Sequence, residues 1–569
     1  KDVGMMTGLF GKGQNIGGRF TQGGGRIAAG TMARGAGASA LRVLGPAAAA
    51  ISVGADVFKL ATTNDAKERK KALGGTIGGA LGGGLGFFLG GPAGLAIGAG
   101  LGQFAGKAIG KFFADEVESK QDTLNRVKSG IDFKIANSGL WSLWAGDVGM
   151  AAGVEFRRET FEDNRDDLLD GSNPFVDQIT GVELSGSDVL GSSPTPDSKA
   201  DRNVTSAYVE FIVPLLDTNS QYMELQLAAR YEDFSDVGDA LKPKVALFWE
   251  PADWLSLRAS YAGGFRAPGL PQVSAEGVPR SNSLYDPVLD STYGIVDIRS
   301  GTTDLKPEDD QNTSFGIVLT PLDNLTFTAD FWKIEQEDLV GILPGSSHLL
   351  YDSLLRSEGS SNEAVIRDAT TNEVIQINND YLNLGVRNIE GIDFSLIYDW
   401  GTSIGDWEFT VNAAQLKKFE QEADPISASL IAAQEAGNPA VPADRTVAGA
   451  GDLMRQNGRP EWRIRAALNW DYNQWGAGIS ANYVDDVLDT STTATVDDEV
   501  IQLPVDSYTT VNVYADYRFE GQSILEGMKV RLGVRNIGDE EPPLADELAH
   551  GYFGSLHSNR GRYFYLNVS

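Results

Sequence analysis

The chain has 569 residues, which is enough for several ordinary domains or for one large barrel. Its net charge of −31 excludes sequence-independent binding to nucleic acid, because such binding needs a basic surface. The absence of cysteine excludes a disulfide scaffold, a thiolate metal site and a cysteine nucleophile. The three histidines, His348, His550 and His557, are too few and too scattered for a two-histidine metal motif. We therefore expect no nucleic-acid partner, no metal and no cofactor.

Composition divides the chain near residue 139. Residues 1–139 hold 32 of the 67 glycines and none of the tryptophans or tyrosines. They carry 17 Lys and Arg against 9 Asp and Glu, a balance of +8. Because the whole chain is −31, residues 140–569 carry −39. The sequence therefore predicts two segments of different structure, 1–139 and 140–569.

In the first segment, residues 72–106 form an uncharged run whose glycines recur every three or four residues. This spacing lines one helix face with small residues, and the turn signal at 90–92 predicts a helical hairpin. Each arm of roughly 17 residues would be about 26 Å long, which is marginal for a bilayer core of about 30 Å. A membrane-inserting glycine zipper and a hairpin buried in an assembly both stay open. Residues 74–113 resemble the Gly-rich region of phage tail tape-measure proteins.

In the second segment, apolar and polar residues alternate with a period of two, as in strands with one apolar and one polar face. Met223, Leu225 and Leu227, for example, alternate with Glu224 and Gln226. This pattern predicts fourteen strands, at 146–158, 204–213, 222–231, 243–250, 254–262, 312–319, 324–334, 386–399, 405–413, 462–470, 475–484, 508–519, 527–536 and 562–569.

The connections between these strands alternate between long and short. The long ones include 263–311, 335–385 and 414–461, and each is followed by a short turn after the next strand. Short periplasmic turns and long external loops are typical of an up-and-down transmembrane β-barrel, whereas a soluble β-sandwich does not explain them. Aromatic residues near the strand ends are expected to form interfacial girdles: Trp249, Trp254, Tyr261, Trp332, Tyr398, Trp400, Trp462, Trp470, Tyr483 and Tyr517.

Several blocks of residues 140–569 resemble the C-terminal β-barrel part of TonB-dependent outer-membrane receptors. They are LWSLWAGDVGMAAGVEFRRE (140–159), YAGGFRAPGLPQ (261–272), TTDLKPEDDQNTSFGIVL (302–319), RNIEGIDFSLIYDW (387–400), VRLGVRNIGDEEPP (530–543) and RGRYFYLNVS (560–569). The resemblance implies a protein of the bacterial outer membrane, in contact with its lipid. It also implies energy-coupled uptake of a scarce external ligand, such as a siderophore or an oligosaccharide, powered through the TonB–ExbB–ExbD complex.

The sequence also departs from this family. Its receptors have 22-stranded barrels filled by an N-terminal plug with a TonB box, and neither the plug nor the box is found here. The chain starts at Lys1 without a signal peptide and stops at Ser569, before the terminal aromatic residue expected of an outer-membrane strand. We therefore expect a truncated receptor barrel joined near residue 139 to a piece of different origin.

Two motifs are expected to fix strand ends and loop exits. They are Gly264, Phe265, Arg266, Ala267 and Pro268, and Leu305, Lys306, Pro307 and Glu308, with Lys306 and Glu308 expected to pair at the barrel rim. The resemblance places ligand contacts in the external loops, where the candidate residues are Tyr285, Tyr293, His348, Tyr351 and Tyr381. Aromatic side chains there could stack on a sugar or on an aromatic ligand.

Other functions would require sequence features different from these. An outer-membrane enzyme would need a Ser–His pair, for which His557 with Ser555 and Ser558 is the nearest candidate, and we expect no enzyme. Acidic runs at 309–310 and 497–499 could bind calcium, but they lack a DxDxDG loop. A phage tail structural protein would show long helical heptads after residue 139. An outer-membrane pore or adhesin is the remaining alternative.

Overall fold

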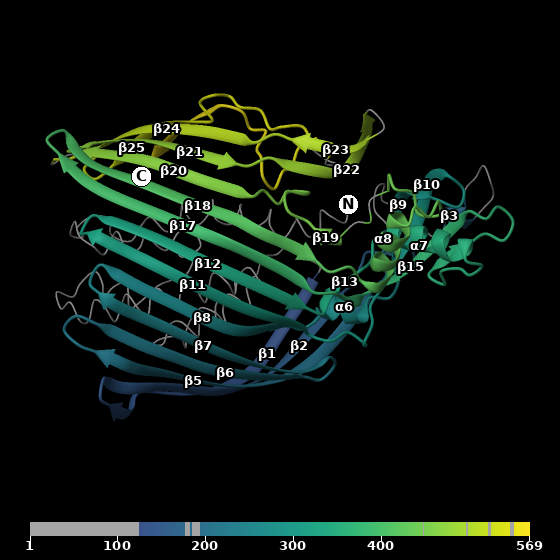
Figure 1. Ribbon diagram of the computed structural model, residues 1–569, viewed down its shortest axis with the longest axis horizontal. Coiled ribbons are helices and arrows are strands. Elements are labelled where there is room, and N and C mark those ends of the chain that lie inside the picture. Colours follow the sequence, from purple (N-terminus) through teal and green to yellow (C-terminus); the bar gives the residue numbers. More distant parts are fainter. Residues whose placement is uncertain are drawn as a thin grey trace.

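A computed structural model of the chain describes residues 124–173, 175–176, 183–184, 194–445, 447, 449–496, 499–521, 525–546 and 551–569. Its main element is a curved antiparallel sheet of 16 strands (Figure 1). The strands along it are β1 (Leu124–Leu143), β2 (Gly146–Asp163), β5 (Ser198–Asp217), β6 (Tyr222–Phe234), β7 (Gly238–Ala252), β8 (Leu255–Arg266), β11 (Glu308–Leu322), β12 (Leu325–Glu337), β17 (Arg387–Thr402), β18 (Gly405–Gln421), β20 (Trp462–Tyr472), β21 (Trp475–Val484), β24 (Tyr508–Arg518), β25 (Lys529–Arg535) and β26 (Tyr563–Val568). The short strand β19 (Gly451–Asp452) pairs with β18 beside this path.

The mainly β fold and all fourteen predicted strands are confirmed, each by one strand of this sheet. Strand β1 was not predicted, and it crosses residue 139 to pair with β2 along nearly its whole length. The predicted glycine-zipper hairpin at 72–106 lies outside the described residues, and the division of the chain into 1–139 and 140–569 stays a prediction.

The strands are longer than a membrane crossing requires. Strands β1 and β5 each have 20 residues, which corresponds to about 66 Å at a rise of about 3.3 Å per residue. A tilted crossing needs only about 9–11 residues. Both strands therefore extend well beyond the hydrocarbon layer. Within the described part of the chain, β1 pairs only with β2 and β26 only with β25, so the sheet is open at both edges.

The two faces of the sheet differ in chemistry, as the alternation predicts. On β21, Ile479 is 47% exposed on the apolar face, whereas its neighbour Ser480 faces Asn512 on the polar face. The same parity runs across paired strands, so that Phe315 of β11 lies opposite Phe331 of β12. On the polar face, Arg258 of β8 forms an ion pair with Asp330 of β12. In a membrane barrel, the apolar face contacts lipid and the polar face lines the interior.

Aromatic rings form a row on the apolar face near the short turns. Five of them stack across β17, β18 and β20, with ring centroids 5.0 to 6.2 Å apart: Tyr398, Trp400, Trp407, Trp470 and Tyr472. The expectation for Trp332 was wrong, because its indole N–H donates a hydrogen bond to Asp393 on the polar face, 3.2 Å away. Its neighbour Phe331 occupies the apolar face, and adjacent residues of a strand cannot share a face.

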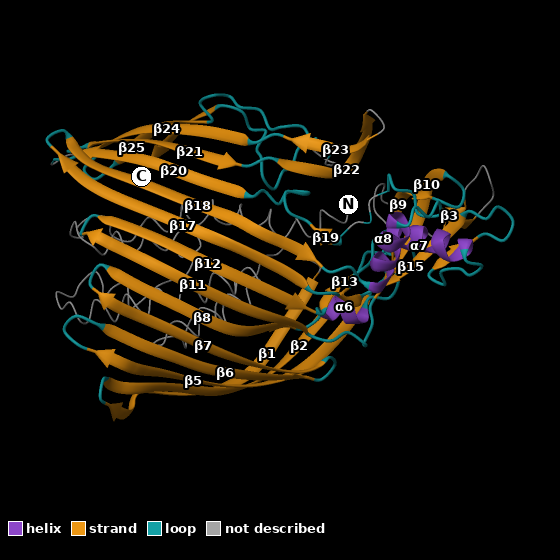
Figure 2. Ribbon diagram, viewed as in Figure 1, coloured by secondary structure: helices purple, strands orange, loops and turns teal. Residues whose placement is uncertain are grey.

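The long connections are folded and lie together at one end of the sheet (Figures 1 and 2). Three of them build an outer lobe from β9 (Val278–Asp286), β10 (Ser291–Ser300), α7 (Gly345–Ser357), β14 (Val365–Arg367), β15 (Val374–Asp380) and α8 (Pro425–Glu435). The other elements in the connections are α6 (Leu270–Ser274), the pair β13 (Leu339–Gly341) and β16 (Leu382–Leu384), the hairpin β22 (Val487–Val496) and β23 (Glu499–Val505), and the pair β3 (Phe175–Val176) and β4 (Glu183–Leu184). None of the helices in the described residues has the length and hydropathy that a membrane crossing requires.

The assignment of the two faces predicts the outcome of a paired substitution on β21. Ile479→Arg places a charge on the lipid face, and we expect a loss of about 2–4 kcal/mol of folding free energy in lipid vesicles. Ser480→Arg, one residue along the same strand, places the same charge in the polar interior and should cost much less. Urea unfolding in vesicles measures both, and equal losses would contradict the assignment.

Candidate functional site

The two sequence motifs meet at the outer end of the sheet through one ion pair. Arg266 at the end of β8 faces Glu308 at the start of β11 in register, and its guanidinium forms two hydrogen bonds with that carboxylate. The Glu308 side chain is 3% exposed, and it also accepts a hydrogen bond from the backbone N–H of Val340 at 2.7 Å. The predicted Lys306–Glu308 pair is wrong: Lys306 is exposed and lies before β11, where only its backbone is held, by Asn383.

The remaining motif residues pack around this pair. Phe265 lies against the cluster formed by Val204, Phe234 and Val237, and its ring meets that of Phe234 edge-on at 6.0 Å. The buried guanidinium of Arg202 donates a hydrogen bond to the carbonyl oxygen of Pro268 at 2.6 Å. These contacts tie the outer ends of β5, β6 and β8 to the start of the following loop.

All five candidate ligand residues lie in the outer lobe or beside it, and two of them form hydrogen bonds through their side chains within it. The Tyr293 hydroxyl donates to Asp286 at 2.6 Å and accepts from the backbone N–H of Val374 at 2.9 Å. His348 is 7% exposed, and its ring nitrogens lie 3.4 Å from Asn379 and from Asn362. Burial lowers the pKa of His348 below its ordinary value.

The other three occupy the junctions between loops. Tyr351 packs against the apolar cluster that joins α7 to α8. The Tyr285 ring lies 3.8 Å from the guanidinium carbon of Arg445, which belongs to a different loop, and its hydroxyl donates to Asp290. The backbone N–H of Tyr381 donates to the carbonyl oxygen of Ser300 at 3.0 Å. A ligand-binding role for these five residues stays a prediction.

A buried ionic network fixes the lobe. The Arg367 guanidinium is 4% exposed and bonds both carboxylate oxygens of Asp286, at 2.7 and 2.9 Å. It also bonds Asp352 of α7 at 2.9 Å, and Arg356 bonds the same carboxylate at 2.8 Å. Since charges removed from water are costly unless each is paired, this network holds β9, β14 and α7 in one arrangement.

Sequence analysis missed a group of arginines at the mouth of the sheet. The group consists of Arg387, which begins β17, and Arg459, which precedes β20. The guanidinium carbons of Arg387 and Arg459 lie 5.5 and 4.6 Å from the centroid of the same ring, that of Phe419 on β18. No sequence motif marks these residues, because the three elements that carry them meet only in the folded sheet.

Neither Arg387 nor Arg459 forms an ion pair within 4.0 Å among the described residues. The Arg387 guanidinium donates a hydrogen bond to the side-chain oxygen of Gln421 at 2.9 Å, and the more distant carboxylate of Glu308 attracts it electrostatically. Burial, and then the charge of Arg387, lowers the pKa of Arg459 to about 10, so its guanidinium stays charged at neutral pH. Two cations on one aromatic ring, with no carboxylate in direct contact, favour an anionic ligand, because guanidinium groups bind oxyanions and stack on aromatic faces.

The described histidines do not form a catalytic pair. His557 is 5% exposed, its ring packs edge-on against Tyr508 at 5.2 Å, and neither ring nitrogen has a hydrogen-bond partner in the described part of the chain. The ring nitrogens of His348 contact only asparagine side chains. His550 and the residues 497–498 lie outside the described residues. In the part of the chain that is described, no group of three or more His, Asp or Glu side chains could hold a metal ion.

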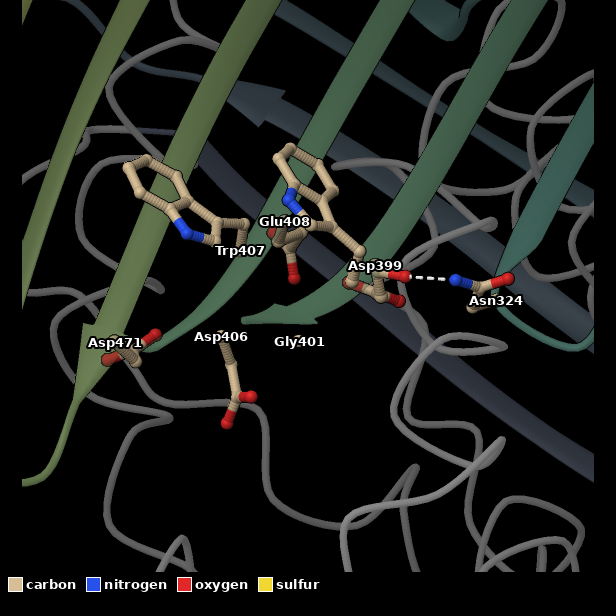
Figure 3. Close-up of a pocket in the computed structure, with 8 residues that line it drawn as sticks. Asn324, Asp399, Gly401, Asp406, Trp407, Glu408 and Asp471 are labelled. Atoms are coloured by element: carbon tan, nitrogen blue, oxygen red, sulfur yellow. Dashed lines mark hydrogen bonds between the residues drawn. The ribbon is translucent and has the colours of Figure 1, made fainter. Parts of the chain in front are cut away.

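A pocket of 390 Å³ lies at the opposite end of the sheet, beside the short turns (Figure 3). It is lined by Asn324, Asp399, Trp400, Gly401, Asp406, Trp407, Glu408 and Asp471. The amide of Asn324 donates a hydrogen bond to the backbone carbonyl of Asp399. Four carboxylates, those of Asp399, Asp406, Glu408 and Asp471, therefore gather at the turn end of β17, β18 and β20.

The curved antiparallel sheet has one face suited to lipid and one polar inner face. It has short turns at one end and folded loops at the other. These features define a β-barrel protein of the bacterial outer membrane. Comparison with known protein families identifies the family to which the chain belongs. The family model "TonB dependent receptor-like, beta-barrel" matches residues 86–537, and the chain belongs to this family. Members of the family are receptors of the outer membrane rather than enzymes, and the chain is localised there. The match begins at residue 86, inside the segment that composition set apart.

Individual relatives agree with this assignment. A curated relative, the probable TonB-dependent siderophore receptor PirA of Acinetobacter baumannii, is 24% identical over 403 residues, which are 69% of this chain and 45% of the relative. The crystal structure of PirA from Acinetobacter baumannii is similar in fold, with a TM-score of 0.50 at 17% identity over 78% of this chain and 54% of that one. A mutant of the ferric enterobactin receptor PfeA from Pseudomonas aeruginosa gives a TM-score of 0.50 at 14% identity, over 78% and 53%. The chain spans about half the length of these relatives.

The Arg266–Glu308 contact predicts a large effect of one substitution and a small effect of another. Arg266→Ala leaves the buried carboxylate of Glu308 without its cation, and we expect a loss of about 2 kcal/mol of stability. Lys306, two residues before Glu308, is exposed, and Lys306→Ala should change stability by less than about 0.5 kcal/mol. Urea unfolding in detergent, followed by tryptophan fluorescence, measures both, and similar losses would show that the pair is unimportant.

His557 predicts a pH-dependent loop. Burial, and then the charge of Arg463, holds the pKa of His557 at about 4, below the ordinary value of 6.5, so the folded loop favours the neutral ring. Stability is therefore complete above about pH 6.5 and falls as the pH drops towards 4. Hydrogen exchange of residues 551–558 should accelerate over that range. The His557→Phe variant serves as the control and should abolish the dependence; an unchanged pH profile in the variant would refute the role of this ring.

Proposed function

We propose that this protein takes up an anionic iron–siderophore complex across the outer membrane, with energy supplied through TonB and its ExbB–ExbD partners. The observation that carries the proposal is the pair of guanidinium groups, those of Arg387 and Arg459, around Phe419 at the outer mouth. Membership of the receptor family and the siderophore-receptor names of its relatives support the same substrate class. A neutral oligosaccharide ligand gives no reason for two cations without an ion-pair partner at one ring.

The chemistry of the mouth favours one class of siderophore over another. A ferric catecholate complex carries several negative charges and presents flat aromatic rings. Guanidinium groups attract such charges and stack on such rings, and the Phe419 ring adds an apolar surface. A ferric hydroxamate complex of similar size is neutral and has no aromatic rings. The proposed site should therefore distinguish the two complexes by charge.

The proposed path continues along the polar inner face. Polar side chains from neighbouring strands form hydrogen bonds with one another there, such as the one between the hydroxyls of Ser260 and Ser314 at 2.7 Å. We propose no chemical step on the ligand, because the described histidines contact neither a serine nor a carboxylate. The energy from TonB would serve to release the ligand from the mouth and to open the path.

The proposal predicts a selective loss of binding. With purified protein in detergent, a ferric catecholate should bind at least tenfold more tightly than a neutral ferric hydroxamate, which corresponds to about 1.4 kcal/mol. The double variant Arg387→Gln, Arg459→Gln should abolish this difference and leave hydroxamate binding unchanged. Arg158→Gln is the matched control, because Arg158 of β2 is exposed and forms an ion pair with Asp201 of β5. Quenching of tryptophan fluorescence reports the affinities.

Two results would contradict the proposal. One is equal affinity of the wild-type protein for the anionic and the neutral complex. The other is catecholate uptake by cells that continues after the proton gradient has been collapsed, since TonB-coupled transport requires that gradient. Uptake of radioactive iron with and without an uncoupler makes the second measurement.

A further inference from the structure

The segment that leads into Arg459 has an unusual backbone. Five residues between 449 and 458 have positive φ angles, from 47° to 87°: Gly449, Gly451, Arg455, Asn457 and Gly458. Arg455 and Asn457 are not glycines, and for such residues, arginine more than asparagine, the left-handed region is uncommon and costs free energy. A backbone held in this way must be fixed by contacts from outside the segment.

Those contacts come from the hairpin β22–β23. The backbone N–H of Leu488 donates to the carbonyl oxygen of Arg455 at 2.6 Å, and the N–H of Asn457 donates to the carbonyl oxygen of Leu488 at 2.8 Å. The side chain of Asn457 then forms a reciprocal pair with Thr490: its amide donates to the Thr490 hydroxyl at 2.7 Å, and its oxygen accepts from the Thr490 backbone N–H at 2.9 Å. We call this set of four hydrogen bonds the clasp.

The clasp is anchored on both sides. The hairpin packs through Val487 and Val505 against Ala545 and Phe553 of the loop that precedes β26. In addition, the Arg455 guanidinium forms an ion pair with Asp486 immediately before the hairpin. The position of the clasp is therefore set by two loops that are distant in sequence from Arg459.

Asn457 of the clasp lies two residues before Arg459 in the sequence. The Arg455 N–H donates to the carbonyl oxygen of Arg459 at 3.0 Å, and the Arg459 guanidinium donates to the carbonyl oxygen of Gln456 at 3.1 Å. The N–H of Leu453 donates to the carbonyl oxygen of Phe419 at 2.8 Å, so the same segment is tied to the residue whose ring Arg459 covers. Any shift of the segment would move the guanidinium relative to that ring.

We propose that Asn457 and Thr490 are positioning residues, which hold the Arg459 guanidinium over Phe419 in the geometry that an anionic ligand requires. The inference rests on the proposed function, because it assigns a specificity-determining role at the same site. Neither residue supplies the binding charge itself; they act through Arg459. This placement requires Asn457 to adopt a left-handed backbone conformation. The hydrogen bonds of the clasp offset the free energy that this conformation costs.

The test compares Thr490→Val with Thr490→Ser. Valine has nearly the same shape as threonine but cannot accept the hydrogen bond from Asn457, whereas serine keeps the hydroxyl. In the first measurement, which needs no ligand, hydrogen exchange of residues 452–459 should accelerate at least threefold in Thr490→Val and stay at the wild-type rate in Thr490→Ser. The urea unfolding midpoint of the barrel should stay the same in both variants.

The second measurement is the binding of the ferric catecholate and of the neutral ferric hydroxamate. Thr490→Val should weaken catecholate binding roughly fivefold and leave hydroxamate binding unchanged, and Thr490→Ser should match the wild type for both. A purely structural role would weaken both complexes equally, which overturns the proposal. Unchanged exchange in Thr490→Val overturns it as well, as does faster exchange with unchanged catecholate binding.

The two measurements separate this inference from the proposed function. If the wild-type protein binds neither complex, the proposed function fails, and the positioning role for an anionic ligand fails with it. The exchange experiment then still decides whether the hairpin holds the segment. If the wild type prefers the catecholate and Thr490→Val behaves like the wild type in both measurements, the proposed function stands and only the clasp is refuted.

Discussion

The structure depends on one constraint: in a bilayer, the backbone N–H and C=O groups must be satisfied by neighbouring strands, because lipid offers no hydrogen-bond partner. An antiparallel ladder meets this constraint and, through its period of two, divides every strand into a lipid face and an interior face. Ile479 and Ser480, adjacent on β21, show the division within a single pair of residues. The polar network of the inner face, including Arg258 with Asp330, is possible only because the other face carries the apolar side chains.

The same constraint moves the specialised chemistry to the ends of the strands. Only there can the chain leave the ladder, and the long connections use that freedom to build a lobe with its own buried ion network around Arg367. They also bring Arg387 and Arg459 together over Phe419, although the two arginines come from different elements. Neither of them forms an ion pair among the described residues, whereas Arg266 at the same end pairs with Glu308. This contrast separates a cation that holds the sheet together from cations that are available to a ligand.

Sequence reasoning predicted the sheet because each strand carries its own alternation, which is a local signal. It missed β1, although Ile131, Phe133 and Ile135 alternate in the same way. The glycine-rich composition before residue 139 indicated helices rather than strands there. It also missed α8, where Asp424 followed by Pro425 is a recognisable helix start, and the Asp424 carboxylate indeed accepts from the N–H groups of Ile426 and Ser427.

Other features could not be read from the sequence, because they depend on contacts between distant residues. Glu308 pairs with Arg266 rather than with nearby Lys306, since register across two strands brings the first two together. The arginine group needs β17, β18 and β20 to be neighbours before it exists. The lobe needs three loops to share one apolar interior, in which Leu350 and Leu354 of α7 meet Leu430 of α8. Trp332 was predicted to lie in the interfacial girdle because it is near a strand end. The alternation along β12 instead places it on the polar face, beside Asp393.

The central claim is that this alternation places one face of the sheet in lipid and the other in a polar interior. A spin-label scan along residues 475–484, with the protein reconstituted in vesicles, tests it most directly. Collision with oxygen, which concentrates in lipid, should be highest at Ala477, Ile479 and Ala481, and collision with a water-soluble nickel chelate should be highest at the positions between them. Accessibilities without a period of two, or with the two collision partners exchanged, would contradict the account.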